Sequence, residues 1–286
     1  MLGQRLVEFY NKNNKFELLC VSYEDSSYLP DINYSKLDLT DKKSVKKIVL
    51  DFYPDVIINT AAYTNVDKCE TEKEAAYNTN VNAVEYLAKY GKITQSKVIH
   101  ISTDYVFDGT EGPYNERERP EPIGYYGRTK LAGENALISS GVNYAIIRTN
   151  VLYGCSKFGR ADFVKWVVNS LKEGKQIKIV NDQINNPTFI DDLVIGISKV
   201  IEFDKTGIYN IAGPEFLNRF EFTKKIADYF GLDKTLISEI TTAELNQVAP
   251  RPLKSGLIIL KAETELGYKP HSIEETFKLM QKELGL

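Results

Sequence analysis

Apolar and polar residues alternate along the chain with two periods, one typical of helices and one typical of buried strands. The first residues follow the helical period, because Leu2, Leu6, Val7, Phe9 and Tyr10 are apolar at helical spacing and Gln4, Arg5 and Glu8 lie between them. Residues 16–21 (FELLCV) are a short apolar run that predicts a buried strand. A helix that leads into a buried strand is half of a β–α–β unit, so the pattern favours an α/β fold.

The same alternation continues over the first two thirds of the chain. The expected strands are 16–21, 55–62, 97–103 and 144–149. The expected helices between them are 41–52, 72–91 and one that begins near residue 125. Strands that alternate with helices predict a doubly wound parallel sheet, Rossmann-like, with helices on both faces.

From about residue 152 the alternation becomes irregular. The elements expected there are a helix near 161–173, a strand at 176–180, a helix at 190–203, a strand at 207–212 and a mostly helical tail. We interpret these late segments as a smaller C-terminal lobe that is added to the first domain.

Composition narrows the class of protein. The chain has 286 residues and a formal net charge of -3, which gives no basic surface for nucleic acid. It has no apolar run of about 18 residues, the length that a membrane span needs. Cys20, Cys69 and Cys155 lie far apart and only two histidines are present, so we expect reduced thiols in a cytoplasmic protein and no metal site.

Polar residues follow three of the apolar strands at the end of each strand. They are Asn59 and Thr60, then Ser102 to Asp104, then Arg148 to Asn150. Ligands of doubly wound sheets bind beyond the carboxyl ends of the strands. The sequence therefore predicts a binding site at this edge of the sheet.

The strongest chemical signal is YYGRTK (125–130), which contains Tyr-x-x-x-Lys. On a helix, Tyr126 and Lys130 share one face. Lowering the pKa of a tyrosine from about 10 to about 7 requires about 4 kcal/mol, and a nearby ammonium supplies part of it. Tyr126 is then a candidate general acid for a carbonyl that receives a hydride, and the Thr103 hydroxyl is placed to hold the carbonyl oxygen.

Four stretches carry a resemblance to a known family: NTAAYTNVDKCE, STDYVFDGTEGPYNE, YYGRTKLAGE and IIRTNVLYG. They resemble the extended short-chain dehydrogenase/reductase family and, within it, the dTDP-4-dehydrorhamnose reductase branch. VNDQINNPTFIDDL and RPLKS also match, so the resemblance covers essentially the whole chain. It implies that NADPH or NADH reduces the 4-keto group of a nucleotide-linked deoxysugar. It leaves NAD versus NADP open, and a homodimer is possible.

The resemblance also implies residue roles. The catalytic residues would be Thr103, Tyr126 and Lys130. The cofactor-binding residues would be Gly3, Asp38, Leu39, Ala61, Ala62, Tyr63, Asn80, Tyr126 and Lys130. The substrate-binding residues would be Asp104, Asn150, Val151 and Arg251. The dinucleotide-binding domain would span 1–151 with returns near 176–212, and the substrate lobe would span 152–175 and 213–286.

The first residues depart from the family pattern. The family begins with a strand and a glycine-rich turn of the type TGxxGxLG, and Met1 to Gly3 match only its last three positions. Either the given sequence lacks a first strand, or the protein is a variant that has lost cofactor binding. We favour the first explanation because the later catalytic positions are intact. For the chain as written, we expect poor solubility and weak cofactor binding.

Three other readings of the sequence stay open. A nucleotide-sugar epimerase or dehydratase is one, but family dehydratases carry Asp-Glu after the Thr, whereas Asp104 and Tyr105 stand here. A non-catalytic subunit like the regulatory subunit of methionine adenosyltransferase is another. His100 is a candidate base, although we expect it and Trp166 to be core residues.

Overall fold

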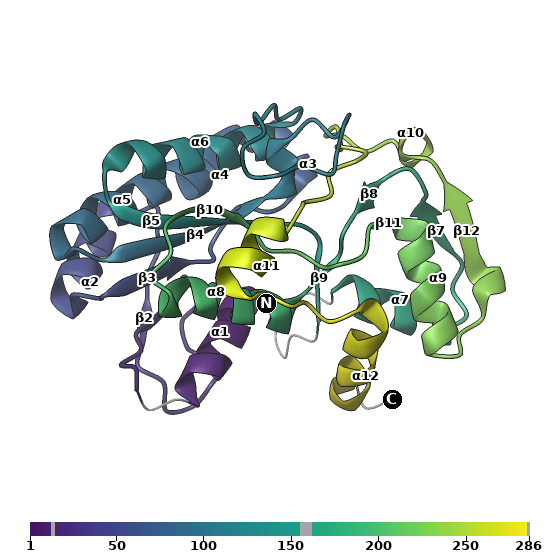
Figure 1. Ribbon diagram of the computed structural model, residues 1–286, viewed down its shortest axis with the longest axis horizontal. Coiled ribbons are helices and arrows are strands. Elements are labelled where there is room, and N and C mark those ends of the chain that lie inside the picture. Colours follow the sequence, from purple (N-terminus) through teal and green to yellow (C-terminus); the bar gives the residue numbers. More distant parts are fainter. Residues whose placement is uncertain (13–14, 155–161, 285–286) are drawn as a thin grey trace.

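The computed structural model describes residues 1–12, 15–154 and 162–284. A parallel sheet lies at its centre (Figure 1). In spatial order its strands are β10 (Gly207–Asn210), β5 (Asn143–Thr149), β4 (Lys97–Thr103) and β3 (Val56–Asn59). All three neighbouring pairs are parallel, so the prediction of an α/β fold with a parallel sheet is confirmed.

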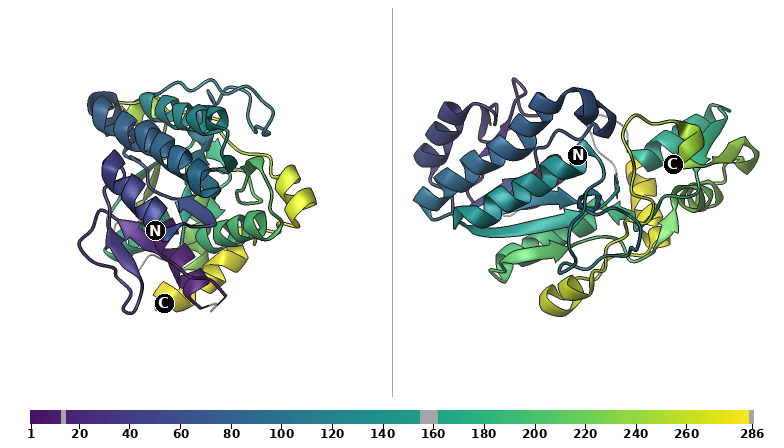
Figure 2. Two further views of the ribbon diagram at one scale, coloured as in Figure 1. Left: turned by 90° about the vertical axis from the view of Figure 1, so that its left-hand side faces the viewer. Right: turned by 90° about the horizontal axis from the view of Figure 1, so that it is seen from above.

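Helices cover both faces of this sheet (Figures 1 and 2). The helices on one face are α2 (Lys42–Phe52), α5 (Ala83–Thr94) and α6 (Tyr125–Ser140). Those on the other face are α1 (Leu2–Asn11), α8 (Ile190–Glu202) and α11 (Leu260–Leu266). Side chains of a strand alternate between faces, so Val98 packs toward α5 and α6 while Ile99 packs toward α8. Both faces are therefore apolar, as the continuous apolar runs predicted.

The first strand differs from the expectation. The run 16–21 was expected to be a buried strand, but β1 is only Cys20–Ser22 and pairs with β2 (Tyr34–Lys36) in a two-stranded sheet of its own. Phe16 precedes the strand and is 48% exposed, and Val21 is 39% exposed. The prediction of burial was wrong because β1 packs at the edge of the molecule rather than inside the main sheet.

Helix α1 has the amphipathic pattern that the sequence predicted. Leu2, Leu6 and Tyr10 recur every fourth residue and are buried together against the α8 side of the sheet. On its other side, Arg5 lies 2.6 Å from a carboxylate oxygen of Asp191 in α8 and 2.7 Å from one of Glu283. The start of α1 lies against the end of β3, since a Cβ on Gly3 would be 2.9 Å from the Thr60 hydroxyl.

The helix expected at 72–91 is interrupted. The segment forms α4 (Lys73–Tyr77), a π-helical turn (Asn78–Asn82) and then α5, and a separate short helix α3 (Val66–Thr71) precedes it. Helix α6 touches this turn closely: a Cβ on Gly133 would lie 2.4 Å from the carbonyl oxygen of Asn80. Such turns occur frequently at functional sites, and this one carries Asn80.

A second region packs around aromatic side chains, on the right of Figure 1. Its elements are α7 (Phe163–Lys172), β7 (Ile177–Val180), α9 (Arg219–Tyr229), β12 (Ile237–Ile240) and α12 (Ile273–Leu284). Residues 176–212 were expected to belong to the dinucleotide-binding domain. Strand β7 instead pairs with β12 in the aromatic region, and only α8 and β10 of this range pack in or against the main sheet. Conversely, α11 packs on α8 and β10, although 213–286 was expected to lie in the lobe. The division into two domains stays a prediction.

The remaining elements are short. They are β6 (Leu152–Tyr153), β8 (Ile184–Asn185), β9 (Thr188–Phe189), β11 (Leu217–Asn218), α10 (Thr242–Leu245) and the 3-10 turns Asp104–Val106 and Lys234–Leu236. Cys20 and Cys69 are free thiols, whereas Cys155 and the start of the helix expected near 161 lie outside the described residues. Within the described ranges, the helices are too short or too polar to cross a membrane.

Candidate active site

The carboxyl ends of β3, β4 and β5 bring the expected polar residues together. Thr103 is the last residue of β4 and pairs in register with Thr149 of β5, while Asn59 of β3 pairs with His100. Helix α6 begins beside them and carries Tyr126 in its first turn and Lys130 one turn later. Thr103, Tyr126 and Lys130 therefore gather at the edge of the sheet where the sequence predicted a site.

Tyr126 forms a hydrogen bond with the Thr103 hydroxyl. Burial raises the pKa of Tyr126 well above its ordinary value, and the bond with Thr103 offsets only part of this effect. The expected lowering toward neutrality is not found, because removing a phenolate from water outweighs the other influences. The neutral phenol, which has a proton to donate, is thus the form that this site holds at neutral pH.

Lys130 is buried, with 1% of its surface exposed. Its Nζ donates to the Ile101 carbonyl oxygen at 2.7 Å and lies 3.2 Å from Nε2 of His100. Burial lowers the pKa of Lys130 to about 8, against the opposing effect of the Glu134 carboxylate. A lysine with a pKa near the ambient pH takes up or releases a proton easily.

His100 contacts Lys130, and the sequence analysis missed this contact. It is fully buried, as expected, but its Nδ1 lies 3.2 Å from Nδ2 of Asn59 and its Nε2 faces Lys130. Burial and the nearby Lys130 charge lower the pKa of His100 well below its ordinary value. The period of two along a strand could have predicted this contact. Val98, His100 and Ser102 alternate along β4 and face α6, which carries Lys130.

An ion pair lies beneath Lys130. Arg148 of β5 donates two hydrogen bonds to Glu134 of α6, at 2.7 and 3.0 Å, and Ser102 donates a third. Arg148 and Glu134 are only 2% and 1% exposed. Bidentate geometry of this kind fixes α6 against the sheet and so sets where Lys130 and Tyr126 lie.

Asp104 was expected to contact substrate, and the structure places it behind Thr103. The carboxylate is 2% exposed and accepts hydrogen bonds from the hydroxyls of Thr103, at 3.0 Å, and Ser255. Burial raises the pKa of Asp104 to about 6, and the bonds from Ser255 and Thr103 act in the opposite direction. The geometry shows that Asp104 orients the Thr103 hydroxyl.

Asn80 organises the loop that was expected to contact the cofactor. Its Oδ1 accepts from the Tyr63 backbone N–H at 2.8 Å, and its Nδ2 donates to the Tyr63 carbonyl and to Thr129. Ala61 is exposed and Ala62 partly exposed at the end of β3, and the Ala61 N–H donates to Asn59. This loop thereby lies between Asn80 and the end of the strand, with part of its surface open to a ligand.

The remaining expected cofactor residues lie nearer the start of the chain. Asp38 is exposed and accepts hydrogen bonds from Thr40, and Leu39 is partly buried against α2 and α5. Among the described residues no side chain caps the start of α1, and Gly3 places that helix end beside Thr60. Uncapped N–H groups at a helix start bind phosphate readily, so the residues present fit a dinucleotide.

The expected substrate residues are engaged in contacts within the chain. The amide of Asn150 donates to Asn186 at 2.7 Å and accepts from the Thr188 hydroxyl at 3.1 Å, and the Val151 carbonyl accepts from the Thr188 N–H. Arg251 pairs with Asp67 of α3, and its guanidinium lies 3.0 Å from a carboxylate oxygen of Asp67. Their contact with a substrate stays a prediction.

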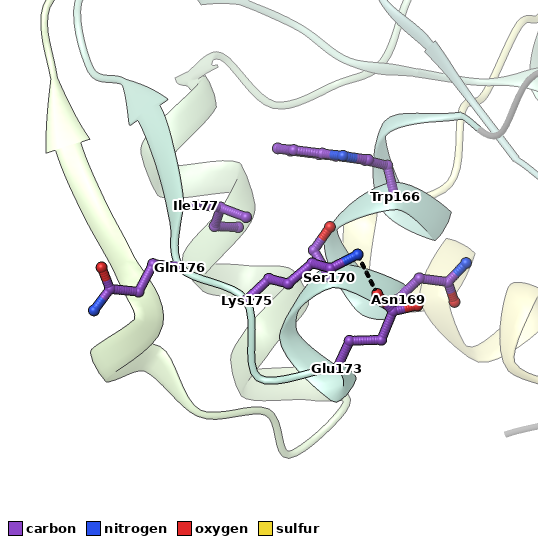
Figure 3. A pocket seen from close by; sticks show the side chains of 7 residues that line it. All are labelled: Trp166, Asn169, Ser170, Glu173, Lys175, Gln176 and Ile177. Carbon is purple, nitrogen blue, oxygen red and sulfur yellow. Dashed lines mark ion pairs between the residues drawn. The ribbon is translucent and has the colours of Figure 1, made fainter.

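A hollow of about 370 Å³ lies in the aromatic region (Figure 3). Trp166 forms one wall, and an ion pair of Glu173 with Lys175 lies at its rim. The prediction that Trp166 is a core residue was wrong, since it is 42% exposed. The buried face of α7 consists of Val164, Val167, Val168 and Leu171, and Trp166 falls on the other side of the helix. The hollow and the Tyr126 group are separate sites.

The fold and the Thr103–Tyr126–Lys130 arrangement define a Rossmann-like oxidoreductase of the extended short-chain dehydrogenase/reductase class. Residues 1–285 match the family model described as RmlD substrate binding domain. The chain belongs to this family.

Relatives of known name agree with this membership. The chain is 34% identical to a dTDP-4-dehydrorhamnose reductase of Aggregatibacter actinomycetemcomitans, over 97% of this chain and 94% of the relative. It is similar to the crystal structure of dTDP-4-dehydrorhamnose reductase from Bacillus anthracis in complex with NADP, with a TM-score of 0.83 and 31% identity over 93% of this chain and 98% of that one. It is also 32% identical to methionine adenosyltransferase 2 subunit beta of Xenopus tropicalis, over 92% of this chain and 79% of the relative.

Proposed function

We propose that the protein reduces the 4-keto group of a nucleotide-linked deoxysugar with NADPH or NADH, as the dTDP-4-dehydrorhamnose reductases do. The observation that carries this proposal is the hydrogen bond between Tyr126 and Thr103, with Lys130 one turn behind on the same helix. This arrangement supplies a proton donor and a second hydroxyl for one carbonyl oxygen.

A bound nicotinamide supplies the hydride. In our proposal the Tyr126 phenol donates its proton to the ketone oxygen. The Thr103 hydroxyl, which donates to Asp104 in this structure, turns its hydrogen to the ketone oxygen when the substrate binds. The phenolate that remains is stabilised by a proton on Lys130, whose lowered pKa of about 8 suits reversible uptake. Gly3, the Ala61–Tyr63 loop, Asn80 and Lys130 are the residues we assign to the dinucleotide.

The sugar nucleotide is assigned from the named relatives and from the absence of a glutamate after Asp104 in the sequence. We propose that it binds between the strand ends and the aromatic region, with Asp104, Asn150, Val151 and Arg251 nearby. A cytoplasmic location and a homodimer also remain proposals. Sedimentation of the purified protein measures whether two copies associate.

The test is to mix the purified protein with NADPH or NADH and dTDP-4-dehydrorhamnose, and to follow loss of the reduced nicotinamide absorbance. We expect one cofactor oxidised per sugar reduced, and a rate about 10² lower in Tyr126→Phe with cofactor affinity nearly unchanged. A Phe variant with a rate within a few fold of the parent contradicts the role of Tyr126.

The similarity to the adenosyltransferase subunit supports a second candidate, a non-catalytic regulatory subunit. The same assay separates the two, because a regulatory subunit binds NADPH without oxidising it. An epimerase or dehydratase is distinguished by its product, since either changes the sugar without net oxidation of NADPH.

A further inference from the structure

Tyr126 lies in the part of helix α6 that the helix itself holds least firmly. Backbone N–H groups in the first turn of a helix have no partner within that helix, and Tyr125 and Tyr126 are the first two residues of α6. The residue before the helix, Gly124, has no side chain that could accept from them. The place of the Tyr126 phenol therefore depends on a partner from outside α6.

Glu70 of α3 is that partner. Its Oε1 accepts a hydrogen bond from the Tyr125 backbone N–H at 2.7 Å, although the two residues are 55 apart in the sequence. This distance is typical of a bond from an N–H to a carboxylate, and the helix dipole also favours a negative charge at a helix start. Helices α2 and α9 differ, because the residue just before each of them, Asp41 or Asn218, caps it. Helix α6 is capped by a different element of the fold.

The capping carboxylate lies close against the start of α6. A Cβ on Gly124 would be 3.4 Å from Oε1 of Glu70 and 3.4 Å from the Pro250 carbonyl oxygen. Three residues before Glu70 on α3, Asp67 accepts a hydrogen bond from the Ala249 N–H at 3.0 Å. Residues three apart on a helix share one face, so one face of α3 holds both the start of α6 and the segment around Pro250.

Helix α3 is in turn fixed to the loop that we assign to the cofactor. Asn65 follows this loop and caps α3, because its Oδ1 accepts from the Lys68 N–H at 3.1 Å. The Cys69 thiol lies 3.8 Å from the Tyr63 carbonyl oxygen, so α3 folds back onto the loop. The bond from α6 to Glu70 therefore ties the start of the catalytic helix to the cofactor loop.

We propose that Glu70 is a positioning residue whose carboxylate caps α6 from α3 and thereby sets the place of the Tyr126 phenol relative to the cofactor loop. Glu70 bonds to the backbone one residue before Tyr126, so it acts through Tyr126 and not on the substrate. The Tyr126 ring packs edge-on against Tyr105, and its hydroxyl bonds to Thr103. This role rests on the proposed function, in which Tyr126 donates the proton.

Two variants of Glu70 isolate the hydrogen bond. Glu70→Gln keeps an oxygen at the place of Oε1, whereas Glu70→Ala removes the acceptor. Glu70 is partly exposed, so in the Ala variant water satisfies the Tyr125 N–H but does not tie α6 to α3. With NADPH and a 4-keto sugar nucleotide, we expect kcat to fall about 10-fold in Glu70→Ala and to stay near the parent value in Glu70→Gln. KM and the Kd of NADPH should change little in both.

Asp41→Ala is the matched control. It removes a bond of the same kind, from the Lys43 N–H to a carboxylate oxygen at 3.0 Å, at the start of α2. We expect the urea midpoint of unfolding to fall in both Ala variants and kcat to fall only in Glu70→Ala. Three results overturn the proposal: an unchanged kcat in Glu70→Ala, a Gln variant as slow as the Ala variant, or a similar loss of kcat in Asp41→Ala.

A measurement without substrate separates this role from the proposed function. In ¹³C-tyrosine-labelled protein, Tyr126→Phe assigns the NMR signal of the Tyr126 ring. We expect this signal to move in Glu70→Ala and to keep its parent position in Glu70→Gln and Asp41→Ala. A signal that does not move in Glu70→Ala contradicts the role of Glu70. The expected shift in a protein that does not oxidise NADPH with the sugar supports that role and contradicts the proposed function.

Discussion

Two buried regions of this molecule contain different kinds of side chain. The catalytic edge, meaning Thr103, Asp104, Tyr126, Lys130 and His100, buries ionisable and hydroxyl groups that bond to one another. The aromatic region around β7 and β12 buries rings: Phe222 stacks between Phe163 and Phe277 with ring centroids about 6 Å apart. A polar contact there is the bond between Tyr153 and Thr276.

The two regions contribute differently to the stability of the fold and to its chemistry. Apolar burial stabilises the aromatic region in proportion to the area removed from water, and each ring contributes independently of protonation. In the catalytic edge burial disfavours charge, and the hydrogen bonds compensate only in particular protonation states. One region supplies a fold that is insensitive to pH, and the other supplies groups whose pKa values are shifted.

The largest expected effect comes from breaking the ion pair that supports the catalytic edge. Glu134→Gln leaves the Arg148 charge buried and turns an amide NH₂ toward a guanidinium N–H, so we expect a loss of about 3–5 kcal/mol in the free energy of unfolding. Urea unfolding measures it. The matched control is Asp51→Asn, whose partner Lys47 is exposed, so the loss should be much smaller than in Glu134→Gln. A similar small loss in both variants contradicts the difference between buried and exposed pairs.

A smaller effect appears in the pH dependence of stability. The Asp104 pKa is raised from 3.8 to about 6, so its protonated form stabilises the native state. This contribution is fully present below pH 3.8 and is lost as the pH rises through about 6. At about 1.4 kcal/mol per pKa unit it amounts to about 3 kcal/mol at most.

Asp104→Asn removes that titration. Relative to the variant, the free energy of unfolding of the parent should fall between pH 4 and 7, as measured by urea unfolding at a series of pH values. Curves that stay parallel over this range show that Asp104 is not protonated more readily in the folded protein.

The smallest effect is expected in the aromatic region. Trp166 is 42% exposed and its ring lies tilted against Phe163, so Trp166→Ala should change the free energy of unfolding by less than about 1 kcal/mol. Trp166 is also the single tryptophan of the sequence. Its fluorescence should be quenched readily by acrylamide in the native protein, and strong protection from quenching contradicts the exposed position.

The sequence by itself determined the local elements and the residues that share one element. Strand β4 runs over Lys97–Thr103 as expected, because a long apolar run bounded by polar residues has one favourable conformation in a buried sheet. Tyr126 and Lys130 share a face of α6 because the helical period requires it. The parallel sheet follows from the alternation of strands and helices.

Tertiary structure decided which distant residues meet. Nothing in the local pattern distinguishes Asp67 as the partner of Arg251 or β12 as the partner of β7. Trp166 and Phe16 are exposed for the same reason: neither the helical nor the strand period states what covers a given face. Periodicity is a property of consecutive residues, whereas burial, hydrogen-bond partners and pKa values depend on the elements that pack together.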